Sequence, residues 1–305
     1  MTDPLGPTRH VGTLFGVPPG RPGPSTDVAV LGLPFDMGAH PNRVGSRDAP
    51  AHIRRHSLAS AERAAEYGVP PLSTLDVVDC GDLDLLPGRV EPSVERIERA
   101  VGALLDAGAV PLTLGGDGTV TLPQLRAVAR RYPGLVVVHY DAHTDAYEVD
   151  EPHPINNATA FKHAATEGLV DPVHSFHVGV RETAVGPERG DLAPAADLGY
   201  QVITVDELAD AGVGATGERL AAALRGRPVY VCWDMDVFDP SVAPGVTTPS
   251  WGGLSAREGL RLIRALAGLN LVAFDINALS PPHDIDGQTG SLAAQVALEF
   301  LLLRV

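Results

Sequence analysis

Aspartate and histidine side chains gather directly after two strongly apolar stretches of the chain. The stretches are 135–140 and 228–233, and five such residues follow them: Asp141, His143, Asp145, Asp234 and Asp236. Within each segment these residues occupy alternate positions, so on an extended chain they point to one side. Carboxylates that share one place repel one another when all are ionised and unpaired, and a divalent cation removes that repulsion. The spacing therefore predicts a metal site.

The chemistry of these ligands limits the choice of metal. Carboxylates with one imidazole suit Mn²⁺, and they also suit Fe²⁺, Ni²⁺ or Zn²⁺. Bridging carboxylates would allow two ions about 3.5 Å apart, an arrangement that activates water for hydrolysis. The alternative is that the acids cap helices or make ordinary salt bridges, and one Asp-x-Asp segment alone would not exclude it. Two such segments, each directly after an apolar run, favour one or two divalent ions per chain.

The apolar runs alternate with longer stretches of helical periodicity. We predict eight strands, at 27–33, 75–78, 110–114, 135–140, 173–178, 201–204, 228–233 and 271–276. We predict helices among them at 92–107, 121–131, 215–226 and 255–267. Several strands are continuously apolar, as expected when helices cover both faces of a parallel sheet. The fold class is therefore α/β, and the polar residues that follow the strands gather at the carboxyl edge of the sheet.

Length and charge limit the partners and the organisation. The 305 residues carry 23 Lys+Arg against 38 Asp+Glu, a formal charge of −15. This balance argues against nucleic acid and against an anionic membrane, because both require basic patches. No run of eighteen apolar residues occurs and the first ten residues have no apolar core, so we expect a cytoplasmic protein. Residues 1–26, rich in Pro and Gly, predict an irregular N-terminal arm, and 27–305 predict a single domain.

The motifs taken together resemble those of the ureohydrolases, the arginase and agmatinase family, and are nearer to agmatinases. The resemblance covers roughly residues 27–304 and rests on VAVLGLPFDMGAHPNRVGSR, LDVVDCGD, GGDG, YDAHTDAY, DMDVFDPSVAPGV and FDINALSPPHD. It implies a three-layer α/β/α fold with an eight-stranded, mostly parallel sheet. It also implies a two-manganese site that hydrolyses the guanidinium carbon of a small-molecule substrate, in a homo-oligomer that is usually a trimer or hexamer.

The metal ligands of this family correspond to residues of the chain one by one. The Asp-Ala-His-x-Asp segment falls on Asp141, His143 and Asp145, and the Asp-x-Asp pair falls on Asp234 and Asp236. The resemblance implies that Asp141 and Asp234 bridge two metals. Asp145 then serves the first metal, and His143 with Asp236 serves the second. We also assign Asp145 and Asp236 to catalysis.

Three positions depart from the pattern of the family. Gly118 stands where a histidine binds the first metal, so that metal loses one of its four protein ligands. Ala278 stands where a glutamate contacts the guanidinium of the substrate, and alanine cannot make that bidentate ion pair. Asn157 stands where a histidine transfers protons, and an amide cannot do so near neutral pH. Ordinary agmatinase or arginase activity is therefore not expected.

Neighbouring side chains are candidates for the missing roles. We name Asn157 and Asn277 as substrate contacts, and His163, on a helix that begins beside the cavity, as a third catalytic residue. The leading hypothesis is a metal-dependent hydrolase acting on a non-peptide C–N bond of an amidine, ureido, amide or modified guanidino substrate. The alternative is a catalytically silent member that serves as a binding or assembly subunit. Against it, all five acidic and imidazole ligands persist, although buried carboxylates cost stability without a cation.

Overall fold

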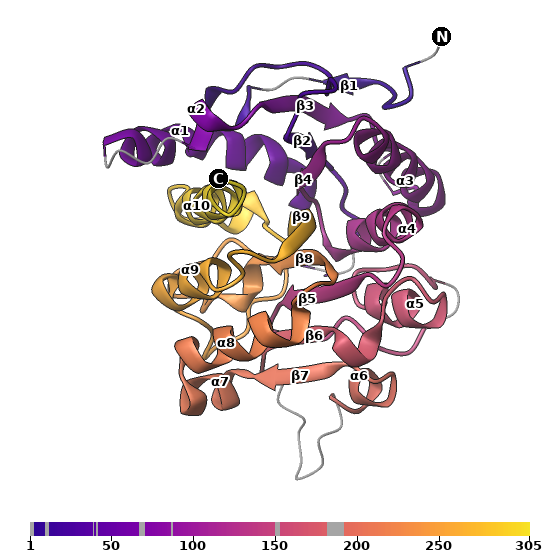
Figure 1. The fold of residues 1–305 in the computed structure, drawn as a ribbon, viewed down its shortest axis with the longest axis vertical. Helices are drawn as coiled ribbons and strands as arrows, with labels where there is room; N and C mark the ends of the chain where they lie inside the picture. Colours follow the sequence, from indigo (N-terminus) through magenta and orange to yellow (C-terminus); the bar gives the residue numbers. More distant parts are fainter. Residues whose placement is uncertain are drawn as a thin grey trace.

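A nine-stranded sheet runs through the centre of the molecule (Figure 1). The computed structural model describes residues 3–9, 12–38, 40, 42–66, 71–86, 88–149, 153–181 and 192–305. The strands are β1 (Thr8–Arg9), β2 (Val28–Gly32), β3 (Val77–Leu83), β4 (Val110–Leu114), β5 (Val136–Tyr140), β6 (Phe176–Val180), β7 (Gln201–Thr204), β8 (Pro228–Asp234) and β9 (Asn270–Asn277). Their order in the sheet is β1-β3-β2-β4-β9-β8-β5-β6-β7. All neighbours are parallel except β1, which pairs antiparallel with β3.

Helices cover both faces of the sheet and give three layers (Figure 1). One layer holds α1 (Ala49–Glu66), α7 (Val205–Ala211), α8 (Val213–Leu224), α9 (Ala256–Arg264) and α10 (Gln288–Leu302). The other holds α3 (Val90–Asp106), α4 (Thr121–Arg131), α5 (Ala160–Thr166) and α6 (Ala193–Asp197). A single turn, α2 (Pro71–Thr74), precedes β3. Each helical layer packs on its own hydrophobic core against the sheet.

Side-chain alternation along the strands produces the two cores. In β2, Val28 and Val30 belong to the core beneath α1 and α10, whereas Ala29 and Leu31 belong to the core beneath α3 and α4. A strand with helices on both sides needs apolar residues at every position, which explains the unbroken apolar runs in the sequence. Polar residues are then tolerated mainly where the strand ends.

The predicted α/β/α class is confirmed, and all eight predicted strands are present. The helices α3, α4, α8 and α9 correspond to the four predicted ones. The ninth strand, β1, lies within the N-terminal arm that the sequence predicts to be irregular, and Thr8 pairs with Leu83 at the sheet edge. Two long helices, α1 and α10, have no counterpart among the predicted helices. Because α10 packs between α1 and α9 and is buried along most of its length, its sequence lacks the polar face that reveals an amphipathic helix.

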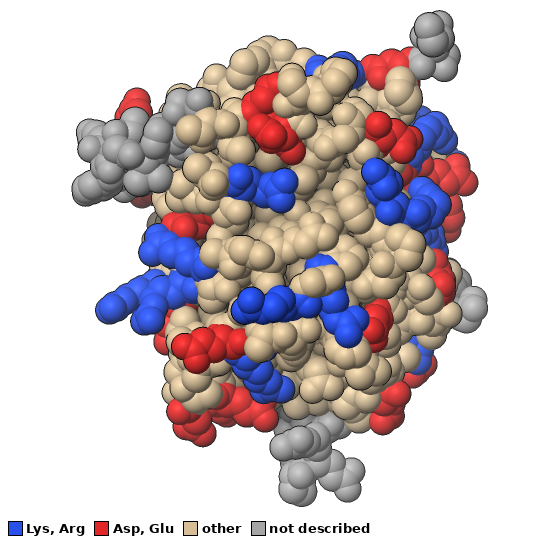
Figure 2. All heavy atoms as spheres, viewed as in Figure 1, with Lys and Arg blue, Asp and Glu red and all other residues tan. Residues whose placement is uncertain are grey.

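The surface shows no single charged region on the face drawn in Figure 2, where basic and acidic side chains are interspersed. Among the described residues, no helix is both long enough and apolar enough to cross a membrane.

Candidate metal centre

The candidate site lies where four neighbouring strands end. The strands β4, β9, β8 and β5 are adjacent at the centre of the sheet (Figure 1). Because they are parallel, they present their carboxyl ends at one edge, where sites form in such sheets. Gly118 follows β4 and Ala278 follows β9. The segment 141–145 follows β5, and 234–236 spans the end of β8. All the predicted metal ligands therefore belong to this edge.

Three of the predicted ligands form one tight group, namely Asp141, His143 and Asp236. The Nδ1 atom of His143 is 3.0 Å from Asp141 Oδ1 and 3.2 Å from Asp236 Oδ2. Ligand atoms of all three lie within 4.8 Å of one another. The His143 N–H donates to Asp141 Oδ1 at 2.7 Å, and the Asp236 N–H donates to Asp234 Oδ1 at 2.7 Å. Each of these hydrogen bonds shapes its own segment, and the Ala142 N–H, which donates to Asp236 Oδ1 at 3.1 Å, joins the two segments.

The group is largely buried, and burial shifts the pKa values of its side chains. Burial, with Asp236 and Asp141 close by, raises the pKa of Asp234 well above its usual value. Burial and Asp141 also raise the pKa of Asp236. Burial alone would lower the pKa of His143, but Asp236 and Asp141 raise it well above its ordinary value. For Asp141, the imidazoles of His139 and His143 outweigh burial and hold the pKa well below its usual value. In the absence of a cation, this environment therefore favours bound protons on His143, Asp234 and Asp236.

These residues fit a divalent cation. The raised carboxyl pKa values show that negative charge is in excess at a place that water cannot screen. A divalent ion would supply the positive charge that bound protons supply otherwise. Carboxylate oxygens with imidazole nitrogen are also the ligand types that Mn²⁺ and its neighbours accept.

Asp145 lies beside two of the positions that depart from the family pattern. Its backbone is left-handed, with φ of 46°, and its carbonyl oxygen accepts the Phe161 N–H at 2.9 Å. A Cβ atom on Gly118 would lie 3.2 Å from Asp145 Oδ2 and 3.1 Å from the carbonyl oxygen of Asn157. Position 118 therefore faces an expected metal ligand, and Asn157 occupies the space that a larger side chain would need.

Ala278 connects the loops that follow β4 and β8. Its N–H donates to the Gly116 carbonyl at 2.8 Å, and its carbonyl accepts the Thr247 N–H at 3.0 Å. It is 2% exposed, and its φ of 60° lies in the left-handed region. That conformation costs an alanine about 1–2 kcal/mol, so the contacts of the two loops must impose it.

His163 and Asn277 are not brought into the acidic group. The Nε2 atom of His163 is 2.6 Å from the Pro154 carbonyl oxygen, because α5 turns this side chain toward its own preceding loop. The amide of Asn277 donates to Thr121 Oγ1 at 3.1 Å and to Asp275 Oδ2 at 3.2 Å. Asn277 thus points from β9 into a buried polar cluster at the start of α4. Their catalytic and substrate-binding roles stay predictions.

Two histidines outside the predicted ligand set contact the site. The Nε2 atom of His139 is 2.8 Å from Asp141 Oδ2, and its Nδ1 atom is 2.9 Å from His177 Nδ1. Ligand atoms of His139, Asp141 and Asp145 lie within 4.8 Å of one another. A signal for His139 exists in the sequence, because it precedes Asp141 by two residues, and alternate residues of an extended segment point to the same side.

Arg181 is a positioning residue that the sequence does not single out. It follows β6, and its guanidinium donates to the carbonyl oxygens of Asp236, Phe238 and Ser250. Burial lowers its pKa. The planar guanidinium with its five N–H donors can hold several carbonyls at once, so Arg181 fixes the loop that carries Asp236.

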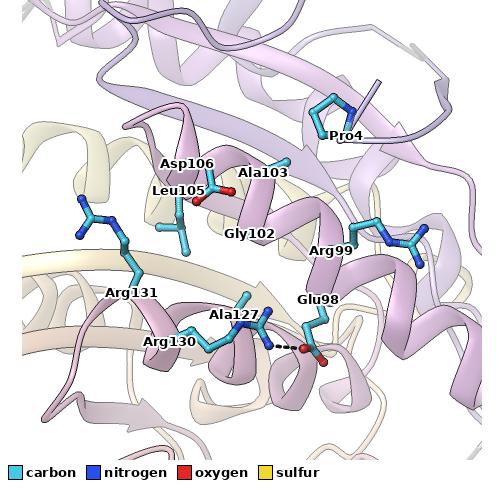
Figure 3. Close-up of a pocket in the computed structure, with 10 residues that line it drawn as sticks. All are labelled: Pro4, Glu98, Arg99, Gly102, Ala103, Leu105, Asp106, Ala127, Arg130 and Arg131. Atoms are coloured by element: carbon cyan, nitrogen blue, oxygen red, sulfur yellow. Dashed lines mark hydrogen bonds and ion pairs between the residues drawn. The ribbon is translucent and has the colours of Figure 1, made fainter. Parts of the chain in front are cut away.

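A separate surface hollow lies between α3 and α4 (Figure 3). Three arginines line it, Arg99, Arg130 and Arg131, and Arg130 pairs with Glu98. Its lining includes no residue from the strand ends, so it does not belong to the candidate metal centre.

The fold and the site together define an α/β protein with a carboxylate-rich candidate metal centre at the carboxyl edge of a parallel sheet. The Arginase family model matches residues 26–303, so the chain belongs to the arginase family. It is 37% identical over 281 residues to guanidinopropionase from Pseudomonas aeruginosa, covering 90% of this chain and 86% of that protein. It is 36% identical over 280 residues to agmatinase from Neisseria meningitidis serogroup C, covering 91% and 87%. The solved structure of proclavaminate amidinohydrolase from Streptomyces clavuligerus matches with a TM-score of 0.89 and 34% identity over 97% of each chain. The predicted resemblance to the ureohydrolases is confirmed.

Proposed function

We propose that the chain is a metal-dependent hydrolase that cleaves a non-peptide C–N bond of a small amidine, ureido, amide or modified guanidino substrate. The observation that carries this proposal is the buried group of Asp141, His143 and Asp236, whose protons a divalent cation would replace. Mn²⁺ is the preferred ion, with Fe²⁺, Ni²⁺ and Zn²⁺ as alternatives and one or two ions per chain. The proposal is supported by relatives that are named as enzymes of this chemistry.

Different residues of the site have different roles in the proposed hydrolysis. A bound divalent cation supplies Lewis acidity, which lowers the pKa of a water molecule and polarises a planar carbon. Asp141 and His143 hold the geometry of the centre. Asp145 and Asp236, whose carboxylates face the same centre, are assigned to orient the attacking water and take up its proton.

The substrate is inferred from what position 278 lacks. A guanidinium keeps its charge in a protein, so burying it without a carboxylate leaves an uncompensated cation. Ala278 is buried and offers no carboxylate. A neutral amide or ureido group, or an amidine or guanidino group whose charge is balanced by another part of the substrate, avoids that cost. The relatives named guanidinopropionase and proclavaminate amidinohydrolase place guanidino acids among the first compounds to test.

We predict negligible release of urea from agmatine or arginine with Mn²⁺ supplied. Losing the charge-assisted contact at position 278 costs about 2–5 kcal/mol, judged from truncated buried charge pairs. At about 1.4 kcal/mol per factor of ten, this is a loss of tens- to thousands-fold. Losing the proton-transfer histidine at position 157 lowers turnover by roughly 10²–10⁴ more. A colorimetric urea assay measures this, and turnover ordinary for the family would show that another carboxylate enters the site.

The decisive experiment is a substrate panel assayed with the protein loaded with each candidate ion. The panel contains neutral amides, ureido acids, amidines and substituted guanidines, with ammonia and urea release as the readouts. Asp236→Asn should abolish any activity found, whereas His174→Asn, at a half-buried histidine before β6 that pairs with Asp171 away from the site, should leave it unchanged. A cation-loaded protein that turns over nothing in the panel would favour the silent alternative.

We further propose that the chain forms a homo-oligomer, a trimer or hexamer, as the resemblance to the ureohydrolases implies. Analytical ultracentrifugation of the purified protein tests this. A single species near 32 kDa, the mass of one chain, would contradict it.

A further inference from the structure

The first metal site of the family pattern is incomplete in this chain. Its nitrogen ligand would come from position 118, where glycine has no side chain. A ligand cannot simply be added there, because even a Cβ atom would lie 3.1 Å from the Asn157 carbonyl oxygen and 3.2 Å from Asp145 Oδ2. Either this site is lost or another residue supplies the nitrogen.

His139 is placed to supply that nitrogen. It lies two residues before Asp141 in β5 and on the same face, so its ring reaches toward the end of the strand. Its Nε2 atom is 2.8 Å from Asp141 Oδ2, and it shares with Asp141 and Asp145 a set of ligand atoms within 4.8 Å of one another. Two ligands bound at right angles to one ion, with bonds of about 2.1 Å, are about 3 Å apart. The observed spacing matches such a pair.

The other ring nitrogen of His139 has the partner that a metal-bound imidazole requires. Metal-ligating histidines almost always donate their second N–H to a fixed acceptor, which sets the tautomer. The Nδ1 atom of His139 is 2.9 Å from Nδ1 of His177, its register partner in β6. His177 is fully buried, and such an environment disfavours a charged imidazole. A neutral His177 can accept the Nδ1–H of His139, which leaves the Nε2 lone pair of His139 free.

Packing fixes both rings. The His139 ring lies 4.3 Å, centroid to centroid, from the ring of Phe161 on α5. The His177 ring meets Tyr200 at 4.6 Å and Phe161 at 5.1 Å, both edge to face. Because both rings are fixed in this way, Nε2 of His139 points in one direction, as a metal ligand requires.

We propose that His139 Nε2 binds the first divalent cation together with Asp141 and Asp145, in place of the side chain that Gly118 lacks, and that His177 orients the His139 ring. This inference rests on the proposed metal dependence of the function. The proposal predicts that the histidine ligand of the first site comes from within β5 and not from the loop after β4. The second site, built on His143, does not require His139.

The test measures bound Mn²⁺ per chain and its affinity, by elemental analysis and calorimetry, in the wild type and in His139→Gln. We expect two ions in the wild type and loss of one in His139→Gln, with the affinity of the other unchanged. His177→Leu should weaken the same ion roughly 10–100-fold, as for other residues that orient a metal-bound histidine. His143→Gln should remove the other ion, and His174→Gln should change neither.

A spectroscopic readout keeps the test valid if a variant fails to fold. Pulsed electron paramagnetic resonance of wild-type protein loaded with Mn²⁺ and carrying ¹⁵N-labelled histidine counts the coordinating imidazoles. Two imidazoles per pair of ions support the proposal. A single one overturns it, as do two ions that persist unchanged in His139→Gln, and His139 is then only an ion-pair partner of Asp141. Wild-type protein that binds no divalent ion contradicts the proposed function itself.

Discussion

Gly118 and Asn157, two of the three positions that depart from the family, lie against each other. A Cβ atom on Gly118 would approach the Asn157 carbonyl oxygen and Asp145 Oδ2 more closely than nearly all real contacts of this kind. Ala278 joins the same region, because its N–H donates to the carbonyl of Gly116 in the loop that carries Gly118. The departures are therefore coupled through packing, and restoring one family residue alone would require its neighbours to move.

We expect Gly118→Ala to destabilise the fold and to weaken cation binding. The added methyl group crowds Asp145, and overpacking of a buried position costs about 1–3 kcal/mol. Gly102→Ala is the matched control, because a Cβ atom there meets nothing within 4 Å and alanine favours the interior of α3 by about 0.5–1 kcal/mol. Urea denaturation and Mn²⁺ titration of both variants measure the effects. Equal stabilities in the two variants would contradict the packing argument.

Cation binding should tighten as the pH rises. His143 and Asp234 have raised pKa values, so both hold protons in the cation-free protein at pH values where free side chains would have lost them. A cation binds only as these protons leave, so the apparent Kd falls about tenfold per pH unit for each proton released. The dependence levels off once the pH exceeds the pKa values of the cation-free protein. Calorimetry in buffers of different ionisation enthalpy counts the protons, and binding without proton release would contradict the assignment.

At the level of elements, the strands could be predicted from the sequence and two of the main helices could not. Continuous apolar runs mark buried parallel strands whatever their neighbours, so all eight were predictable. The helices α1 and α10 pack on each other and are placed by tertiary contacts rather than by an amphipathic pattern. In the same way, Asp141 and Asp234 can be predicted from the sequence as candidate metal ligands, because each follows an apolar run. The contact of His139 with His177 is not, because the register of β5 against β6 sets it over a separation of 38 residues.

The long helix α1 is tied to the sheet by an ion pair that no local pattern predicts. Arg54 donates to both carboxylate oxygens of Asp79, at 2.8 and 2.9 Å, and also to Asp82. Arg54 and Asp79 are almost completely buried. The β3 carboxylates therefore depend on a charge that α1 supplies.

We expect Arg54→Met to destabilise the protein by about 3–5 kcal/mol. The substitution leaves the carboxylates of Asp79 and Asp82 without their cation in a buried place. Arg55→Met, at an exposed position of the same helix, should change the free energy of unfolding by no more than about 0.5 kcal/mol. Chemical denaturation of both variants, followed by far-UV circular dichroism, gives the comparison. A loss in Arg54→Met as small as that in Arg55→Met would show that water reaches these carboxylates.

At the scale of the whole molecule, the candidate metal centre joins segments that are far apart in the sequence. Its proposed ligands come from the ends of β5 and β8, which are neighbours in the sheet although 95 residues separate Asp141 from Asp236. A bound cation therefore links the two strands at the centre of the sheet. Because the unfolded chain cannot hold the ligands in this arrangement, cation binding adds to the stability of the folded state.

We expect Asp236→Asn to be more stable than the wild type without the cation and less stable than the wild type with it. Burial raises the pKa of Asp236, so its ionisation opposes folding at any pH above the unfolded value, and removing the charge should stabilise the cation-free protein. With Mn²⁺ at 100 times its Kd, the wild type gains about 2.7 kcal/mol, which the variant loses with its ligand. Thermal unfolding with and without Mn²⁺ should therefore place the variant above the wild type without the ion and below it with the ion. If Mn²⁺ raises the Tm of both proteins equally, Asp236 is not a ligand, and the excess negative charge at this edge of the sheet must have another purpose.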